Sequence, residues 1–206
     1  MGRSGTYHSP RRTEQAAATR TAIIEAAARL FAERGYAATT MAAIAGEARV
    51  AVKSVYTLAD KARLMLLAVD RAIAGDDEPV AMADRPRVRA IVAATDPAEQ
   101  TRAAARLGAE TLLRLYPIYR AFEQAAAIDA ELRAHWQEYQ TRRYADTTRI
   151  VAALPALRPG LTRERATETI WALVTWHPVA LLVEERGWTA EQLTEWLEDL
   201  FTTLLR

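Results

Sequence analysis

Helical periodicity runs along most of this chain, and it is the feature that most limits the possible folds. Apolar residues recur at intervals of three and four, as Ile23, Ala27 and Leu30 do in the first such segment, which places them on one face of an α-helix. The strict alternation of apolar and polar residues that marks a half-buried strand is absent. Glycine and proline are scarce inside the periodic segments. The sequence therefore predicts an all-α protein.

Charge is balanced over the whole chain but unevenly distributed along it. The chain carries 27 Lys and Arg against 26 Asp and Glu, yet residues 1–70 hold 10 basic against 6 acidic residues. A basic end suits contact with a phosphate backbone. The sequence contains no cysteine, which excludes disulfides, thiol catalysis and cysteine-ligated zinc. With a polar N-terminus and no apolar run of about 18 residues, we expect a cytoplasmic protein without a membrane anchor.

The segment 75–84, GDDEPVAMAD, interrupts the periodicity with Gly, Pro and three consecutive acids, and we place a domain boundary there. Before it we expect a disordered basic arm over residues 1–18 and a DNA-binding domain over 19–75. Its helices should lie near 20–34, 51–58 and 61–74, with a further short helix that Thr39 or Thr40 caps and that ends near residue 48. Gly35 ends the helix at 20–34 and Asp60 caps the one at 61–74.

A larger helical domain for ligand binding and dimerisation is expected over residues 76–206. Pro117 should end its first helix, because proline disrupts helix interiors. Gly187, Trp188 and Thr189 predict a tight corner, made of a C′ glycine, a stapling Trp and an N-cap. The expected helices are 96–115, 118–126, 129–154, 162–186 and 189–205.

Two short helices, 40–48 and 51–58, joined by a turn at Arg49 and Val50, form the bihelical pattern of a helix-turn-helix. At 100° per residue, one side of the second helix carries Val52, Lys53, Tyr56 and Thr57. Ala51, Ser54, Val55 and Leu58 share the other side, which we expect to pack on Ile44 and Leu30. The first set should therefore face outward. The same pattern also fits a purely structural helical corner, in which Tyr56 would be a half-buried core residue.

Two N-terminal segments resemble a known family. AAARLFAERGY, residues 26–36, resembles the first helix of TetR/AcrR-family transcriptional regulators, and TTMAAIAGEARVAVKSVYTLADKARLMLLAVD, residues 39–70, resembles their helix-turn-helix and connecting helix. The C-terminal segment 181–205 is similar to one group of these regulators. Three features depart from the family pattern: Arg49 replaces the usual turn glycine, Ala51 replaces a capping Ser or Thr, and the loop before Lys61 is one residue short.

The resemblance implies contacts with double-stranded operator DNA. Lys53, Tyr56 and Thr57 would reach bases or phosphates. Thr40 would place a hydroxyl and a helix N-terminus on the backbone, and Lys61 would neutralise a phosphate. The complete set of expected DNA-binding residues is Thr40, Arg49, Val52, Lys53, Tyr56, Thr57 and Lys61.

Aromatic residues gather in the larger domain, and helical bundles place ligands between facing helices. We name Tyr116, Trp136, Trp171 and His177 as candidate ligand-binding residues, although aromatic residues at helical spacing are more commonly core. Pro178 lies inside the helix expected at 162–186, so we expect a kink beside His177. The effector expected from this cluster is a small hydrophobic or aromatic molecule.

Apolar residues cover a wide face of the last helix, where Leu200, Phe201 and Leu204 exceed what one subunit is expected to cover. We therefore expect a C2 homodimer, in which the helices 162–186 and 189–205 of two subunits form a four-helix bundle.

These features together predict a ligand-responsive DNA-binding regulator, a repressor released from a palindromic operator by its effector. An enzyme is disfavoured, because the three histidines are scattered and the sequence has neither a Gly-rich phosphate loop nor metal-ligand spacing. We accordingly expect no catalytic site, no metal and no cofactor. A regulator that binds DNA without a small-molecule effector stays open.

Overall fold

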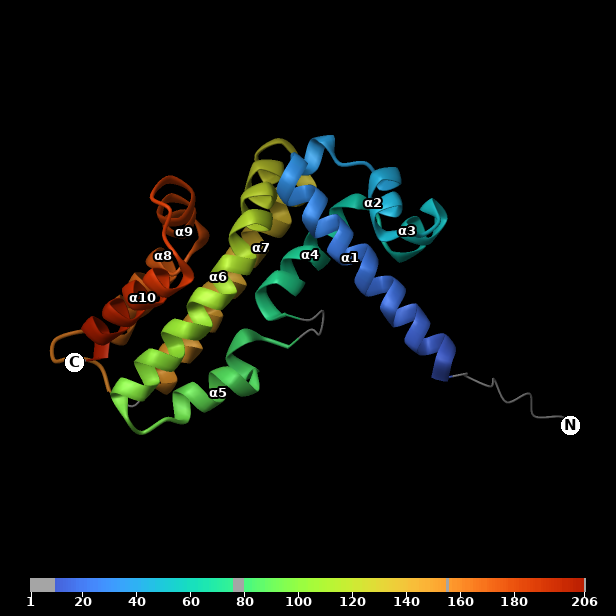
Figure 1. Cartoon of the computed structure of the whole chain (residues 1–206). Coiled ribbons are helices and arrows are strands. Elements are labelled where there is room, and N and C mark those ends of the chain that lie inside the picture. Colours follow the sequence, from blue (N-terminus) through green and yellow to red (C-terminus); the bar gives the residue numbers. More distant parts are fainter. Residues whose placement is uncertain (1–9, 76–79, 155, 206) are drawn as a thin grey trace, which may run out of the picture.

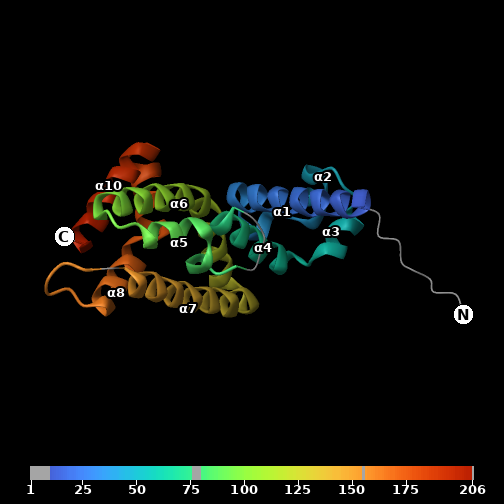
Figure 2. The ribbon, with the colours of Figure 1, turned by 90° about the horizontal axis from the view of Figure 1, so that it is seen from below.

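The computed structural model describes residues 10–75, 80–154 and 156–205, and every regular element in these ranges is a helix. Figure 1 shows a small N-terminal group of helices on one side of two long central helices, with the last helices on the other side. The start of α1 and the end of α10 lie at opposite ends of the described structure (Figure 2). The all-α prediction is confirmed.

Four helices form the N-terminal group: α1 (Pro10–Ala38), α2 (Met41–Ala48), α3 (Val52–Leu58) and α4 (Lys61–Ala74). Their ends follow the predicted capping residues. Asp60 accepts a hydrogen bond from the Arg63 N–H at the start of α4, and Gly75 closes that helix with a φ of 82°. Gly35 interrupts α1 with a φ of 77° and a ψ of 167°, at the predicted end of the first helix.

Helix α1 is longer at its N-terminal end than predicted. It begins at Pro10, so the expectation of a disordered arm over residues 1–18 is wrong for residues 10–18, while residues 1–9 lie outside the described residues. Proline suits the first turn of a helix, where its missing N–H has no partner to lose. The following stretch contains Glu, Gln and three Ala, which are strong helix formers that extend an existing helix at little cost.

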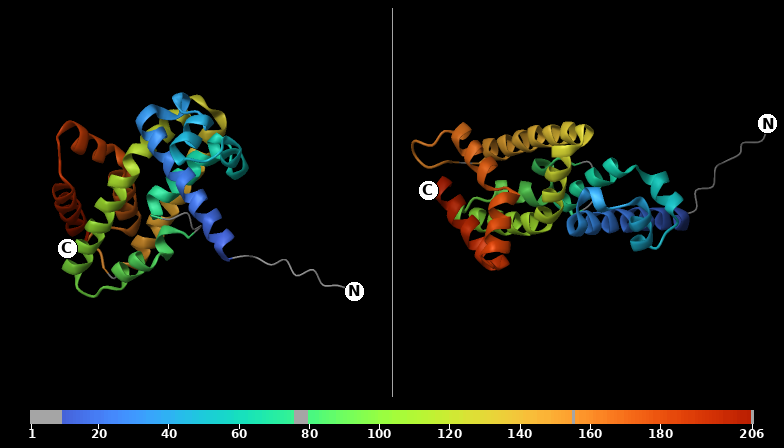
Figure 3. Two further views of the ribbon diagram at one scale, coloured as in Figure 1. Left: turned by 45° about the vertical axis from the view of Figure 1, so that its right-hand side comes forward. Right: turned by 90° about the horizontal axis from the view of Figure 1, so that it is seen from above.

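The rest of the chain is built around α6 (Pro97–Ile128), which packs against α1, α4, α7, α9 and α10. A short 3-10 helix, η1 (Met82–Asp84), and α5 (Pro86–Ala93) precede it; neither was predicted from the sequence. Helix α7 (Ala130–Ala153) runs back beside α6, and α5 lies between these two helices (Figure 2). Helix α8 (Arg163–Leu173), α9 (Trp176–Ala180), a π-helical turn, η2 (Leu181–Glu185), and α10 (Ala190–Leu205) complete the chain, with α10 lying along α6 (Figure 3).

Helix α6 continues through Pro117, where the sequence predicted an end. A proline inside a helix costs about 3 kcal/mol through the lost hydrogen bond and the ring clash. The residues around it compensate for this cost, because Leu115, Ile118, Tyr119 and Phe122 are all buried, and each buried side chain of this size contributes about 1.5–3 kcal/mol. The two helices predicted at 96–115 and 118–126 are therefore one.

The sequence predicted one helix over 162–186 with a kink near Pro178, and the structure has a full break there. Helix α8 ends at Leu173 and α9 begins at Trp176, so Pro178 lies in the first turn of α9, where a missing N–H costs nothing. The Arg143 side chain of α7 donates hydrogen bonds to the carbonyl oxygens of Trp171, at 2.8 Å, and Val174, at 3.2 Å. The Arg143 guanidinium thus replaces the backbone N–H donors that are missing at the break between α8 and α9.

The corner before α10 also follows the prediction. Gly187 has a φ of 68°. The Thr189 N–H donates to Gln192 Oε1 at 2.9 Å, and the Gln192 N–H donates to Thr189 Oγ1 at 3.3 Å. This reciprocal pair is a complete capping box, and it fixes the direction in which α10 leaves the turn.

Two apolar clusters make up the core. The larger one contains Phe31 of α1, Leu64 of α4, Phe122 of α6 and Leu132 of α7. Since it extends from the N-terminal helices into the central pair, the two predicted domains share one core. The smaller cluster joins α6 to α10 through Ala109, Leu193 and Leu197.

The expectation that Leu200, Phe201 and Leu204 exceed what one subunit covers needs correction. Leu204 is 6% exposed, and Leu200 and Phe201 pack half-buried against the smaller cluster. These three side chains are therefore largely covered within one protomer.

No single helix among those described has both the length and the apolar composition to cross a bilayer. Helix α8 and the stretch 176–185, with a bend of 41° between them, meet these two criteria only as a pair.

Thr39 should be important for the stability of the N-terminal helices. Its side chain is 1% exposed, and its Oγ1 lies 2.8 Å from the Gly35 carbonyl oxygen and 3.0 Å from that of Leu30. We expect Thr39→Val, which keeps the shape of the side chain, to lower the free energy of unfolding by about 1–3 kcal/mol, because the one hydroxyl donor that these two carbonyl oxygens share is lost. Urea unfolding measures this loss. Thr203→Val, which removes an exposed hydroxyl bonded within its own helix, is the control and should change stability little.

Candidate DNA-binding and ligand-binding sites

Helix α3 presents the face that its periodicity predicted. Tyr56 is 62% exposed and Val52 is 42% exposed, and Lys53 and Thr57 are also exposed. Val55, on the opposite side, is fully buried. Because Tyr56 points to solvent, the alternative of a half-buried structural tyrosine does not hold. The exposed face carries one cation, one phenol and one hydroxyl, which can meet phosphates and base edges.

The turn between α2 and α3 holds two of the departures noted in the sequence. Arg49 adopts a left-handed conformation, with φ of 56° and ψ of 43°, which costs a non-glycine residue about 1–2 kcal/mol. Ala51 occupies the N-cap position of α3 and makes no side-chain capping bond. The fold of the turn thus tolerates both departures, and the exposed Arg49 side chain lies directly before α3.

Thr40 and Lys61 lie at the N-termini of α2 and α4. Thr40 Oγ1 accepts a hydrogen bond from the Ala43 N–H at 3.1 Å, so its hydroxyl already serves the helix cap. Lys61 Nζ lies 3.4 Å from the Ala37 carbonyl oxygen and 4.3 Å from the centre of the Tyr36 ring. Partial burial lowers the pKa of Lys61 below its usual value. Its ammonium group is held against α1, and it would have to leave this position to reach a phosphate.

Restoring the missing cap of α3 should stabilise the protein. We expect Ala51→Ser to raise the free energy of unfolding by about 1 kcal/mol, because a hydroxyl at the N-cap satisfies a free backbone N–H of the first turn. The backbone at Ala51 is already extended, as this role requires. Thermal unfolding measures the gain. Ala134→Ser, at an exposed position inside α7, should be slightly destabilising; a gain of equal size there would contradict a capping effect.

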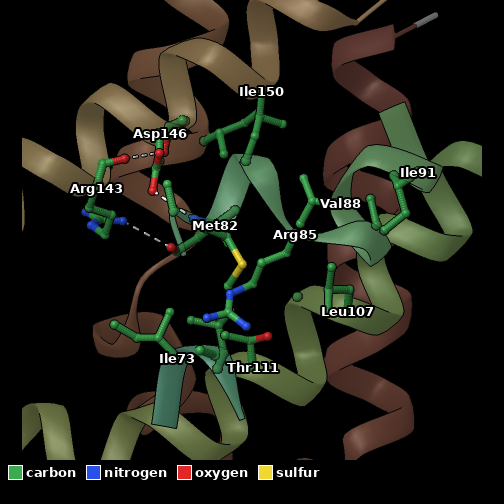
Figure 4. A pocket seen from close by; sticks show the side chains of 18 of the residues that line it. Ile73, Met82, Arg85, Val88, Ile91, Leu107, Thr111, Arg143, Asp146 and Ile150 are labelled. Atoms are coloured by element: carbon green, nitrogen blue, oxygen red, sulfur yellow. Dashed lines mark hydrogen bonds between the residues drawn. The ribbon is translucent and has the colours of Figure 1, made fainter. Parts of the chain in front are cut away.

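A cavity of about 830 Å³ lies between the N-terminal helices and the C-terminal ones. Its walls come from α4, the stretch 80–85, α5, α6, α7, α8 and α10. Figure 4 shows side chains from several of these elements converging on it, with Arg85 reaching in between Met82 and Thr111. The cavity therefore joins the connecting helix α4 to every major helix of the larger domain.

The stretch 80–85 closes one side of this cavity and is fastened to α7. The Met82 N–H donates to Asp146 Oδ2 at 3.2 Å (Figure 4), and Arg149 donates to Asp84 at 2.8 Å. Arg89 also donates to Asp84, and these two guanidinium groups hold the pKa of the Asp84 carboxyl below its usual value. The ion pairs are exposed, so they position the stretch rather than contribute much stability.

None of the four predicted ligand-binding residues lines this cavity. Trp136 packs with its ring centre 4.7 Å from that of Tyr119, and Tyr116 packs against the core clusters. Trp171 packs on Tyr144 and lies under the Arg143 guanidinium. The His177 side chain is 56% exposed and lies 3.3 Å from Glu123. The structure does not bring the four residues together in one cavity. Ligand binding by these residues stays a prediction.

The cavity-lining residues that sequence analysis missed are mainly aliphatic. Their periodicity is indistinguishable from that of an ordinary core, so it carries no sign of a cavity. One available signal was the row of polar residues on the buried face of α6, namely Gln100, Thr101 and Thr111. Gln100 and Thr101 bond to nearby backbone carbonyls. In the described part of the chain, no group of His, Cys, Asp and Glu is arranged to hold a metal ion.

Residues 23–58 match the family model for bacterial regulatory proteins of the tetR family. The helix-turn-helix region therefore matches the TetR family in sequence. The matched segment includes α2, the turn and α3, which form the helix-turn-helix predicted from periodicity. The resemblance drawn from the sequence is confirmed.

Solved structures of several transcriptional regulators share the fold of nearly the whole chain. A TetR-family regulator from Mesorhizobium loti is 20% identical with a TM-score of 0.69, and the alignment covers 91% of this chain and 95% of that one. NalD, the secondary repressor of the MexAB-OprM multidrug efflux pump in Pseudomonas aeruginosa, is 24% identical with a TM-score of 0.66, covering 93% and 98%. A regulator from Saccharomonospora viridis in complex with choline is 19% identical with a TM-score of 0.66, covering 91% and 98%. No curated protein matches this chain in sequence.

Proposed function

We propose that this chain is a homodimeric transcriptional repressor of the TetR family, which leaves a near-palindromic operator when a small molecule enters the central cavity. The observation that carries the proposal is the position of α4. This helix follows the recognition helix α3 after only Ala59 and Asp60, and its residues Arg63, Leu67 and Ile73 line the cavity.

The DNA-binding half of the proposal is supported by the exposed face of α3. Recognition helices of this kind enter the major groove and contact base edges, and a dimer places its two helices about 34 Å apart, one turn of DNA. Each protomer would contribute Lys53, Tyr56 and Thr57 from α3, with Thr40 and Lys61 at flanking helix N-termini. A symmetric dimer then requires an operator with two similar half-sites.

The effector half is supported by the size and place of the cavity. Its volume of about 830 Å³ lies within the range of about 300–1,000 Å³ typical of small-molecule sites. Ligand complexes are known for structurally similar proteins, namely SmeT with triclosan and the Saccharomonospora viridis regulator with choline.

The coupling between the two sites would run through α4 and α6. A ligand that displaces α4 also moves α3, because two residues are too few to absorb the shift. Helix α6 packs on both α1 and α4, so it would transmit changes from the break at Val174, which also lines the cavity. A few ångströms of change in the separation of the two recognition helices would prevent both from engaging fixed half-sites.

The test is a DNA-shift assay with the promoter fragment upstream of the chain's own gene, followed by ligand titrations with and without that DNA. A ligand found by thermal shift, which at 100 times its dissociation constant adds about 2.7 kcal/mol of stability, should bind the DNA-free protein more tightly. Thermodynamic linkage requires that DNA weakens ligand binding by the same factor, typically about 5- to 150-fold, by which the ligand weakens DNA binding. Equal ligand affinity in the two titrations would remove the coupling, and no shift with the promoter fragment would count against regulation of that gene.

A further inference from the structure

The wall of the central cavity is aliphatic. Leucine, isoleucine, valine and methionine make up half of its described lining residues, among them Leu67, Ile91, Leu107 and Ile150. Tyr139 and Phe201 are the only aromatic residues among the described lining residues. A planar aromatic ligand gains from stacking on rings, and a quaternary ammonium gains from a cage of them. Two rings on different helices, α7 and α10, form no such cage and offer few stacking partners, so the wall suits an aliphatic body.

The charges at the cavity favour an anion. Among the described lining residues, Arg63, Arg142 and Arg143 stand against two aspartates, Asp70 and Asp146. Both aspartates already have cationic partners, since Arg142 lies 3.2 Å from Asp70 and Arg149 lies 3.6 Å from Asp146. Asp146 also accepts a hydrogen bond from the Met82 N–H. These described residues therefore carry a positive excess.

Arg143 is the lining residue at which this positive charge is available to a ligand. Its guanidinium donates to Gln140 Oε1 at 3.3 Å and to the Trp171 and Val174 carbonyl oxygens, and all three acceptors are neutral. Within the described ranges no carboxylate pairs with it. Burial lowers the pKa of Arg143, as expected where a cation lacks a counter-ion. A guanidinium has five N–H donors, so donors remain for an anion after these three hydrogen bonds.

Thr111 provides a second, independent sign of a polar ligand group. It lies on the cavity side of α6 (Figure 4). Its Oγ1 is buried and has no hydrogen-bond partner in the part of the chain that the structure describes. A buried hydroxyl without a partner lowers the free energy of unfolding by about 1–3 kcal/mol, so the Thr111 hydroxyl does not stabilise the fold. A ligand oxygen would give it a partner.

From these observations we infer that the central cavity takes an aliphatic carboxylate, whose apolar body lies against the aliphatic wall and whose carboxylate is bound by the Arg143 guanidinium. This inference rests on the proposed function in treating the cavity as the effector site. Arginine is the side chain best suited to such an anion, because its N–H fork matches the two carboxylate oxygens. The Thr111 hydroxyl gives the ligand a further polar contact.

The inference is tested on the full chain by calorimetric titration with three probes that share one alkyl chain: dodecanoate, dodecan-1-ol and dodecyltrimethylammonium, each below its micelle concentration. We expect dodecanoate to bind with one molecule per chain, at least about tenfold more tightly than the alcohol, because charged hydrogen bonds are worth about 1.5–3 kcal/mol. The ammonium should bind most weakly. Equal or tighter binding of the alcohol or the ammonium would overturn the inference. Titration with cholate, a fused-ring aliphatic acid, shows whether the cavity prefers a rigid ring system or the flexible chain of dodecanoate.

Arg143→Met should abolish the preference for dodecanoate over dodecan-1-ol. The matched control is Arg133→Met on the same helix, because Arg133 also donates to two backbone carbonyls, those of Ala126 and Ala127, but does not line the cavity. The control should keep the preference. A preference that survives in Arg143→Met would contradict the assignment of the carboxylate to this residue.

Thr111→Val keeps the test decisive if Arg143→Met fails to fold. We expect this variant to bind dodecanoate several-fold more weakly while its unfolding temperature stays the same or rises, because a methyl group replaces a hydroxyl without a partner. Unchanged dodecanoate affinity would contradict the role of Thr111 in binding. The titrations need no DNA, so dodecanoate that binds selectively but leaves the operator complex intact would refute the proposed coupling alone. A neutral effector that releases DNA would refute the inference alone.

Discussion

Replacing Leu181 with arginine should produce a monomer that no longer binds its operator. Leu181 is 62% exposed where α9 passes into η2, and Leu173 is 38% exposed at the end of α8. Both lie on the helices that we propose form the dimer's four-helix bundle. In a symmetric interface the substitution buries two guanidinium groups, and burying a charge without a partner costs several kcal/mol. Sedimentation at micromolar concentration measures the loss of the dimer.

Ile128→Arg is the control for this experiment. Ile128 is even more exposed, at 74%, but it lies at the end of α6, outside the proposed bundle, so this variant should stay dimeric. A substitution at Leu200 would be less informative, because that side chain packs within its own protomer. A dimeric Leu181→Arg variant would place the subunit interface elsewhere.

Tyr56→Ala should weaken operator binding at least about tenfold without affecting stability. The tyrosine is 62% exposed in the protomer, so its removal leaves no cavity in the core. In the proposed complex it lies at the DNA surface, where a lost base contact costs about 1–3 kcal/mol, and the dimer loses one such contact in each half-site. Fluorescence anisotropy with a labelled promoter fragment measures the affinity, and thermal unfolding verifies the fold.

Tyr144→Ala provides the matched comparison. Tyr144 is a tyrosine of α7 that is 37% exposed, far along the chain from the helix-turn-helix. We expect its removal to leave operator affinity unchanged. If the two variants bound DNA equally well, the outer face of α3 would not be the recognition surface.

The N-terminal domain could be predicted from the sequence in some detail, because its determinants are local. The 100° spacing of side chains along seven residues was enough to assign Tyr56 to the outside of α3 and Val55 to the core. Asp60 and Gly75 marked helix ends through capping and left-handed backbone geometry, which depend only on near neighbours.

The central cavity could not be predicted, because it depends on elements far apart in the sequence. Leu67, Ile91 and Phe201 lie on α4, α5 and α10, and each looks like an ordinary core residue in its own helix. The aromatic residues misled the search for a ligand site, since Tyr119, Phe122 and Trp136 pack on one another. Pro117 led to a wrong prediction of a helix end for the same reason. The burial of its neighbours outweighs the cost of a proline inside a helix, and that burial depends on helices far away in the sequence.

The cavity has one wall on α4, the helix that follows the recognition helix, and other walls on α5 and α10. This division would allow ligand specificity and operator control to evolve separately. Substitutions on α4, at Leu67 or Ile73, alter a helix that also carries the recognition helix, so any change in ligand fit there disturbs operator control as well. Substitutions at Val88 and Ile91 of α5, or at Phe201 of α10, reshape the opposite walls, away from that helix. New chemical specificities should therefore arise first on α5 and α10, and those helices are the places to begin when engineering this protein into a biosensor for another compound.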